Sequence, residues 1–135
     1  MEHNRCAVLS RDEDVADLFS KVLLEAGYDD PERSDDVRIA KLRTYLPRVL
    51  MIDVDHIRND KLESIRQIRF VLPECAIAVV SSNLQPSWAK QCHMAGANGV
   101  LASGSSAHRM IAGLRSAIKT GCYTDPDFAA ALNGN

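Results

Sequence analysis

The sequence has no long apolar run, no marked excess of charge and no glycine-rich segment. A membrane-spanning helix needs about 20 consecutive apolar residues, and no stretch of the chain approaches that length. The formal net charge is only −2, so the composition does not predict direct binding to nucleic acid or to a membrane. The N-terminus leads into an apolar strand pattern without a signal peptide, and we therefore expect a cytoplasmic protein.

The cysteines also lack the arrangements that hold metals. None of the four lies in a C-x-x-C pair, and Cys92 is followed directly by His93. Adjacent residues are poorly spaced for binding the same metal ion. We predict that the cysteines are small buried thiols in a reducing compartment. The four are Cys6, Cys75, Cys92 and Cys122.

The sequence does contain a five-fold alternation of short apolar runs and helical patterns. The expected strands are residues 6–9, 31–34, 49–53, 76–80 and 99–102, and a helix is expected after each. Strands that alternate with helices predict a parallel sheet with helices on both faces. The 135 residues suit one such domain. The predicted fold class is therefore α/β, a five-stranded parallel sheet in a doubly wound (βα)5 arrangement.

Polar and glycine residues mark the expected ends of the helices. Asp12 is the predicted N-cap of the first helix, and Asp35 or Asp36 of the second. Gly121 ends the last long helix, which bounds a domain of residues 1–121. Residues 122–135 are expected to form a linker-like C-terminal tail, in which the Asp-Pro pair at 125–126 could start a short helix.

Asp53 is the first candidate site residue. It ends the apolar run 49–52, which predicts a buried strand that delivers a carboxylate to the edge of the sheet. Ligands of parallel α/β sheets bind outside the carboxyl ends of the strands. Ser81 ends the next strand, and Asp55 lies in the loop after Asp53. Asp55 could form an oxygen site for a hard cation together with Asp53, or it is a solvated loop acid.

The chain resembles the receiver domain of bacterial two-component response regulators over residues 5–120. Receivers usually carry a Pro-x-apolar-Asp phosphoacceptor segment, and residues 47–53 match it. Ser81 falls on the switch hydroxyl at the end of strand four, and residues 96–97 fall on the family's Gly-Ala pair. The resemblance implies a CheY-like fold and a phosphoprotein, in which Asp53 accepts a phosphoryl group from a sensor histidine kinase during phosphorelay signal transduction.

The segment after the last helix narrows this resemblance. Residues 121–129 are similar to the start of the inter-domain linker in the NarL/LuxR-type subfamily. That subfamily usually carries a helix-turn-helix DNA-binding domain after the receiver. The resemblance thus implies a C-terminal output domain that these 135 residues do not include, and the chain is either part of a longer protein or a stand-alone receiver.

Three features of the family's site differ in this sequence. Receivers carry an acidic pair that holds Mg²⁺, a lysine after strand five and an aromatic switch residue within strand five. These positions fall on Ser10 and Arg11, on Ser103 and on Val100, respectively. Because the metal and the lysine neutralise phosphoryl charge in the family, the resemblance implies a degenerate site with weak or absent Mg²⁺ binding. No other cofactor is expected.

Arg11 has two possible roles at this site. It could form a salt bridge with Asp53 that stands in for the cation, or it could point to solvent beside a decayed site. Shifting the alignment by two residues would supply residues 12–13 as the acidic pair, but it would put Asp17 in the core-facing place of Val15. We therefore keep Asp12 as a helix cap rather than a displaced ligand.

Two other residues near the site have ordinary interpretations. His56 is predicted to be a surface histidine on the loop after Asp53, although it could titrate near neutrality. Trp88, on the helix after strand four, is either a partner contact or partly buried packing.

These features predict an atypical receiver, with a phosphorylation-independent pseudo-receiver that mediates protein interaction or dimerisation as the alternative. We expect a homodimer, formed through the first and last helices or through the last helix and its neighbouring strand. We do not predict an enzyme. Residues 51–55 look like the D-x-D motif of haloacid-dehalogenase-type phosphatases, but that motif normally ends the first strand. Residues 10–13 contain no glycine that would bring backbone N–H groups to a nucleotide phosphate.

Overall fold

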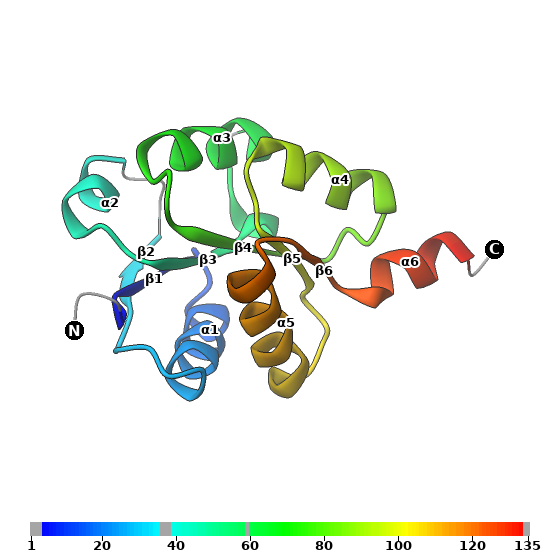
Figure 1. Ribbon diagram of the computed structural model, residues 1–135, viewed down its shortest axis with the longest axis horizontal. Helices are drawn as coiled ribbons and strands as arrows, with labels where there is room; N and C mark the ends of the chain where they lie inside the picture. Colours follow the sequence, from blue (N-terminus) through cyan, green and yellow to red (C-terminus); the bar gives the residue numbers. More distant parts are fainter. Residues whose placement is uncertain (1–3, 36–38, 59, 134–135) are drawn as a thin grey trace.

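A six-stranded parallel sheet lies between two layers of helices in the computed structural model, which describes residues 4–35, 39–58 and 60–133 (Figure 1). The sheet order is β2-β1-β3-β4-β5-β6. The predicted α/β fold is thus confirmed, with one strand more than predicted. The strands are β1 (Cys6–Leu9), β2 (Glu32–Ser34), β3 (Val49–Asp53), β4 (Ala76–Ser81), β5 (Gly99–Ala102) and β6 (Tyr123–Thr124).

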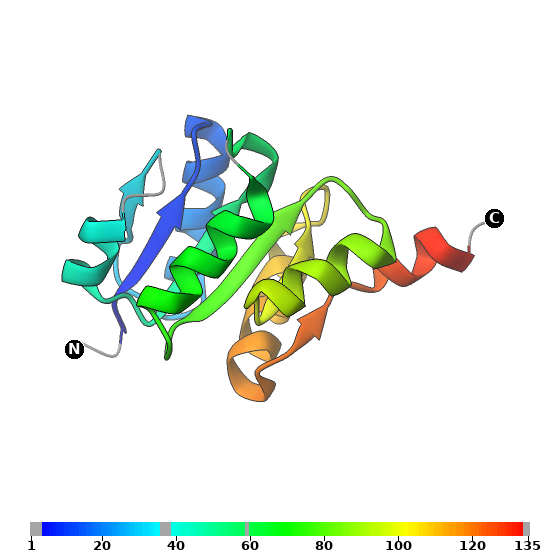
Figure 2. The same ribbon diagram turned by 90° about the horizontal axis from the view of Figure 1, so that it is seen from above.

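The helices cover both faces of the sheet. Helices α2, α3 and α4 lie on one face and α1 and α5 on the other (Figure 1), and Figure 2 shows α3 and α4 crossing the sheet from above. Among the residues described, no helix is both long and apolar enough to cross a membrane. The helices are α1 (Glu13–Glu25), α2 (Ile39–Tyr45), the short 3-10 helix η2 (Val54–His56), α3 (Lys61–Val71), α4 (Pro86–Ala95), α5 (Ala107–Thr120) and α6 (Pro126–Asn133).

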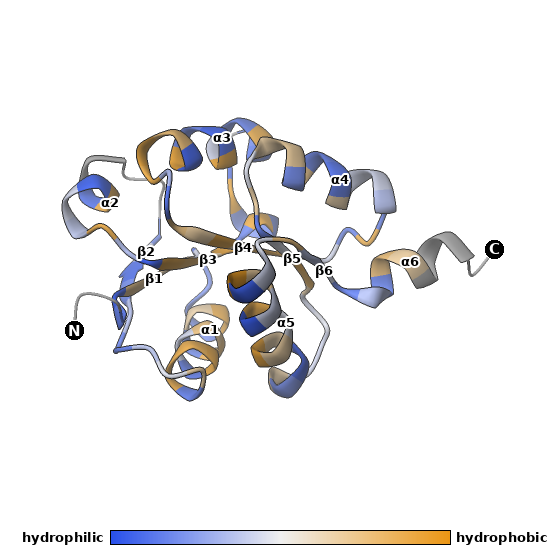
Figure 3. Cartoon of the chain, in the orientation of Figure 1, coloured by the Kyte–Doolittle hydropathy of each residue, from blue (hydrophilic) through white to orange (hydrophobic). Residues whose placement is uncertain are grey.

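Strand β3 is buried along its whole length. Successive side chains of a strand point to opposite faces. Leu50 and Ile52 accordingly pack in the apolar cluster under α2, α3 and α4, whereas Val49 and Met51 pack in the cluster under α1 and α5. Figure 3 shows the central strands as hydrophobic. Burial on both faces explains why this strand reads as one continuous apolar run rather than an alternating pattern.

The predicted cap of the first helix is confirmed. The Asp12 carboxylate accepts a hydrogen bond from the Val15 amide at 3.1 Å, at the start of α1. Helix α2 begins at Ile39, and Asp36, one of its two suggested caps, lies outside the described residues. Gly121 ends α5 with φ +82°, a left-handed conformation that glycine adopts at low cost.

The segment expected to be a linker-like tail is packed onto the domain where it is described. Residues 123–124 pair with β5 and extend the sheet, with Tyr123 opposite Gly99. Helix α6 follows and lies against α4. Phe128, on α6, is 1% exposed and belongs to the same apolar cluster as the inner face of α4. Phe128 thus holds the tail against α4, a contact that the short, Ala-rich sequence of the tail does not predict.

Candidate functional site

Asp53 ends β3 in the middle of the sheet. Its neighbour on one side is β1, and the strand order changes direction between these two strands, because β2 lies beyond β1 and β4 lies beyond β3. Such a switch point is where open α/β sheets bind their ligands. Asp53 is only 4% exposed. A buried carboxylate is costly unless it is paired or hydrogen-bonded, so its partners define the site.

Ser10 is the first partner of Asp53. Ser10 directly follows β1, and its hydroxyl donates to Asp53 Oδ2 at 2.8 Å. The same hydroxyl oxygen accepts the Asp12 amide at 3.1 Å, which fixes the Ser10 side chain to the backbone that starts α1. Ser10 therefore lies at the site.

His56 is the second partner of Asp53. Its Nδ1 lies 2.5 Å from Asp53 Oδ2, and its ring is 44% exposed. An ionised carboxylate only accepts hydrogen bonds, so with Asp53 in that form Nδ1 is the donor. The prediction of an ordinary surface histidine missed this contact. The signal was the spacing, because η2 places residues three apart above one another, and Asp53 and His56 are three apart.

The two oxygens of Asp53 have different surroundings. Ser10 and His56 both bond Oδ2, whereas no donor in the described part of the chain bonds Oδ1. Among the described residues, no fully buried side-chain oxygen or nitrogen lacks a hydrogen-bond partner. One oxygen of the carboxylate is held by two donors, and the other has no donor among the described residues.

The hydroxyl of Ser81 is buried at the end of β4. In the β3–β4 register Asp53 lies opposite Val80, so Ser81 is one residue further along the strand. Ser81 Oγ accepts hydrogen bonds from Trp88 Nε1 at 3.1 Å and from the Asn83 amide at 3.0 Å. Trp88 is partly buried on α4, and its contact with Ser81 ties that helix to the loop after β4.

Asp55 connects the loops after β3 and β4. Its two carboxylate oxygens accept the Ser82 amide at 3.0 and 3.1 Å. The side chain is exposed, as a loop acid is expected to be, but it is held by this contact. Asp55 therefore bonds the Ser82 amide, whereas Asp53 bonds Ser10 and His56.

The positions to which the receiver resemblance assigns the cation-binding and switch residues lie in different surroundings. Arg11 is exposed, and within the described part of the chain it forms no ion pair with Asp53, so the proposed salt bridge is absent. Ser103 is exposed, and its amide donates to the Ser81 carbonyl at 3.0 Å. Val100 is fully buried in the core of the sheet.

The residues around Asp53 do not fit a Mg²⁺ site. Magnesium prefers carboxylate and carbonyl oxygens in an octahedral arrangement. Here the neighbours of Asp53 are a hydroxyl and an imidazole nitrogen, neither of which is a carboxylate or carbonyl oxygen, and the Asp55 oxygens bond the Ser82 amide. Among the described residues no group of three or more His, Cys, Asp or Glu side chains is arranged to hold a metal. We therefore assign no chemical step to a metal.

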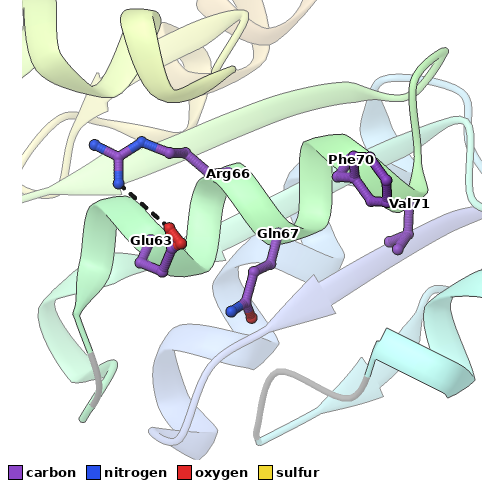
Figure 4. A pocket seen from close by; sticks show the side chains of 5 residues that line it. All are labelled: Glu63, Arg66, Gln67, Phe70 and Val71. Atoms are coloured by element: carbon purple, nitrogen blue, oxygen red, sulfur yellow. Dashed lines mark hydrogen bonds and ion pairs between the residues drawn. The ribbon is translucent and has the colours of Figure 1, made fainter.

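A separate depression lies on the outer surface of α3. It has a volume of about 450 Å³ and is lined by Glu63, Arg66, Gln67, Phe70 and Val71 (Figure 4). Figure 4 shows the Glu63–Arg66 ion pair at one end and Phe70 at the other. Phe70 is 84% exposed. The depression shares no residue with the Asp53 site.

Solved structures share this architecture at low sequence identity. A LuxR-family two-component response regulator from Aurantimonas sp. matches with a TM-score of 0.78 and 16% identity, over 96% of this chain and 95% of its own. The chemotaxis response regulator CheY4 of Vibrio cholerae matches with a TM-score of 0.73 and 19% identity, over 84% and 97%. The chain has the fold of a response regulator receiver domain.

A third structure of this fold contains a modified aspartate. It is a response regulator protein from Burkholderia pseudomallei with a phosphorylated aspartic acid, a calcium ion and citrate, and it matches with a TM-score of 0.72 and 17% identity over 98% of this chain and 75% of its own. No protein-family model and no curated protein matches the chain. The receiver fold is therefore established by three-dimensional similarity, and the role of each side chain rests on the geometry above.

Proposed function

We propose that this chain is an atypical receiver module, a signal-transduction domain rather than an enzyme, in which Asp53 accepts a phosphoryl group. The observation that carries the proposal is a buried carboxylate at the switch point of a receiver fold, with Oδ2 held by two donors and Oδ1 bonded by none among the described residues. Asp125 is the other buried acid among the described residues, and Arg109 neutralises it at 2.7 Å. Asp53 is the buried acid that lies at the carboxyl ends of the strands, where ligands of such sheets bind.

The transfer itself needs only a donor and the free oxygen. A lone pair of Asp53 Oδ1 attacks the phosphorus atom, and the bond from phosphorus to the donor's leaving group breaks. The leaving group departs with the electron pair, and an acyl phosphate forms on Asp53. By the receiver resemblance, the donor is the phosphohistidine of a sensor kinase in the cytoplasm.

The added charge would act on the neighbouring loops. A phosphoryl group brings nearly two negative charges and several strong acceptor oxygens. The Ser81 hydroxyl and the Ser82 amide lie at the adjacent strand end, where they are now bonded to Trp88 and Asp55. A phosphoryl group on Asp53 would compete for hydrogen bonds from the Ser81 hydroxyl and the Ser82 amide. Because Ser81 is bonded to Trp88 on α4, this competition would shift α4. This change is the output that we propose for a homodimer or for an attached domain of the NarL/LuxR type.

A second candidate is a pseudo-receiver that works without phosphorylation. Two contacts favour it, because Asp55 holds the Ser82 amide and Trp88 holds the Ser81 hydroxyl without any phosphoryl group. Loops that are already fixed suit a constitutive interaction module. In this case the α5–β5–β6 side of the domain, or α1 with α5, would form a permanent homodimer.

Intact-mass analysis after incubation with acetyl phosphate tests the proposal. We expect a phosphoryl adduct on the unaltered chain and none on Asp53→Ala. Asp55→Ala is the matched control, because it removes a nearby carboxylate and should keep the adduct. Absence of the adduct with acetyl phosphate and with sensor kinases would select the pseudo-receiver. Light scattering over a range of concentrations measures the predicted homodimer in either case.

A further inference from the structure

We infer that Ser10 and His56 together take over the orienting role of a divalent cation at the Asp53 site, so that Asp53 accepts a phosphoryl group without a metal. This inference rests on the proposed function, because it describes how the proposed acceptor is prepared. It assigns a positioning role to His56, a residue that otherwise resembles an ordinary loop histidine.

The two donors converge on one oxygen. Ser10 Oγ and His56 Nδ1 both bond Asp53 Oδ2, at 2.8 and 2.5 Å. Hydrogen bonds to an ionised acceptor are short and stronger than those between neutral groups. Two of them fix the rotation of the carboxylate, and they leave Oδ1 as the oxygen that can attack. A cation bound to Oδ2 would orient the carboxylate in the same way.

Both donors are held in place before any phosphodonor arrives. His56 stands one 3-10 turn after Asp53, so the backbone of η2 sets its position. Ser10 is anchored by the Asp12 amide, and the Asp12 side chain in turn caps α1. Groups that are already in place around the carboxylate orient it without any rearrangement during the reaction.

The same contacts persist through the transfer. When Oδ1 attacks phosphorus, Oδ2 becomes the carbonyl oxygen of the acyl phosphate, and it still accepts from Ser10 and His56. Neither donor gives up its proton, and the departing acetate of acetyl phosphate takes the electron pair of the broken P–O bond. The step therefore balances without a metal and without a general acid.

The test measures the initial rate of adduct formation from acetyl phosphate, in EDTA and in excess Mg²⁺. We expect equal rates for the unaltered chain under both conditions. His56→Ala and Ser10→Ala should each lower the rate roughly ten-fold or more, because the carboxylate can then rotate and Oδ1 is no longer held in position for attack. His56→Gln, which keeps an N–H donor, should recover part of the rate. His108→Ala removes an exposed histidine on α5 and should change nothing.

A readout independent of the transfer reports on the same contact. Long-range ¹H–¹⁵N spectra should show the proton of His56 on Nδ1 in the unaltered chain, and Asp53→Ala should remove this preference. Circular dichroism confirms that each variant is folded. Replacing the hydroxyl by an acid, in Ser10→Asp, should make adduct formation depend on Mg²⁺, because it restores a second carboxylate beside Asp53.

The possible failures are distinguishable. An adduct that requires Mg²⁺ in the unaltered chain would overturn the inference and leave the proposed function standing. A metal-independent adduct that both alanine variants form at the normal rate would also overturn it. No adduct under either condition, from acetyl phosphate or from sensor kinases, would refute the proposed function and the inference with it.

Discussion

The indole nitrogen of Trp88 donates a hydrogen bond to the hydroxyl oxygen of Ser81 at 3.1 Å. This contact joins α4 to the end of β4, one residue past the strand partner of Asp53. Trp88 also packs on the apolar cluster that contains Phe128 of α6. A physical path of contacts therefore runs from the candidate site through α4 to the C-terminal helix, and several of its links can be tested singly.

Ser81→Ala should destabilise the protein by about 1 kcal/mol, because it removes the acceptor of the Trp88 indole while leaving the donor half-buried. The measurement is urea unfolding followed by circular dichroism. Trp88 is the sole tryptophan, so its emission should shift to longer wavelength in the same variant. Ser81→Thr keeps the hydroxyl and serves as control. Equal stability and emission for both variants would show that the bond contributes nothing.

Gly113→Ala should destabilise the protein by about 1–3 kcal/mol, although alanine is normally the better helix residue by about 1 kcal/mol. A Cβ at Gly113 would meet Tyr123 Cε2 at 2.6 Å and Leu101 Cδ2 at 2.8 Å. Gly104→Ala is the matched control, since a Cβ there meets no atom within 4 Å. Thermal unfolding compares them. A stabilised Gly113→Ala would mean that Tyr123 does not sit beneath α5.

Phe128→Ala should release α6 from the domain. Removing a buried phenylalanine side chain costs about 3–5 kcal/mol, and the loss falls on the terminal segment that Phe128 anchors. Hydrogen exchange should therefore rise in residues 123–133 and along the inner face of α4. Phe70→Ala, at a position 84% exposed, should change exchange and stability little. Unchanged exchange in α6 would show that other contacts hold the tail.

The thiols should differ in their reactivity toward iodoacetamide. Burial raises the pKa of Cys6, Cys75 and Cys92 to about 12, whereas Cys122 is exposed. The thiolate is the reacting form. At mildly alkaline pH the native chain should thus acquire one label and the denatured chain four, as counted by mass spectrometry. Cys122→Ser should abolish the native label, and any label remaining there would contradict the burial of the other three.

The same thiols predict how stability depends on alkaline pH. Their pKa is about 12 in the folded chain and 9.0 for a free thiol, so above pH 9 the unfolded chain loses protons that the folded chain keeps. The folded state then binds more protons, and stability must fall as pH rises. The contribution is complete below pH 9 and declines up to about pH 12. Urea midpoints measured across this interval should decrease, and a flat profile would refute the prediction.

Several features of the site follow from short stretches of sequence. The run 49–52 with Asp53 after it specifies a buried strand that ends in a carboxylate, and Asp12 caps α1 through its own local turn. The contact between His56 and Asp53, by contrast, cannot be predicted from the local sequence. Its spacing from Asp53 suits a contact only if the intervening residues form a 3-10 turn, and the apolar-to-polar pattern there is equally compatible with an open loop.

The sequence alone determined the α/β alternation and the strand that carries Asp53, because strand length and helix period are local properties. Tertiary structure alone decided that Ser10 and His56 hold the same oxygen of Asp53, that the exposed Arg11 forms no ion pair with it, and that Phe128 packs beside α4. These outcomes depend on contacts between segments far apart in the chain or on one particular turn, and the folded packing selects among arrangements that the local sequence allows equally.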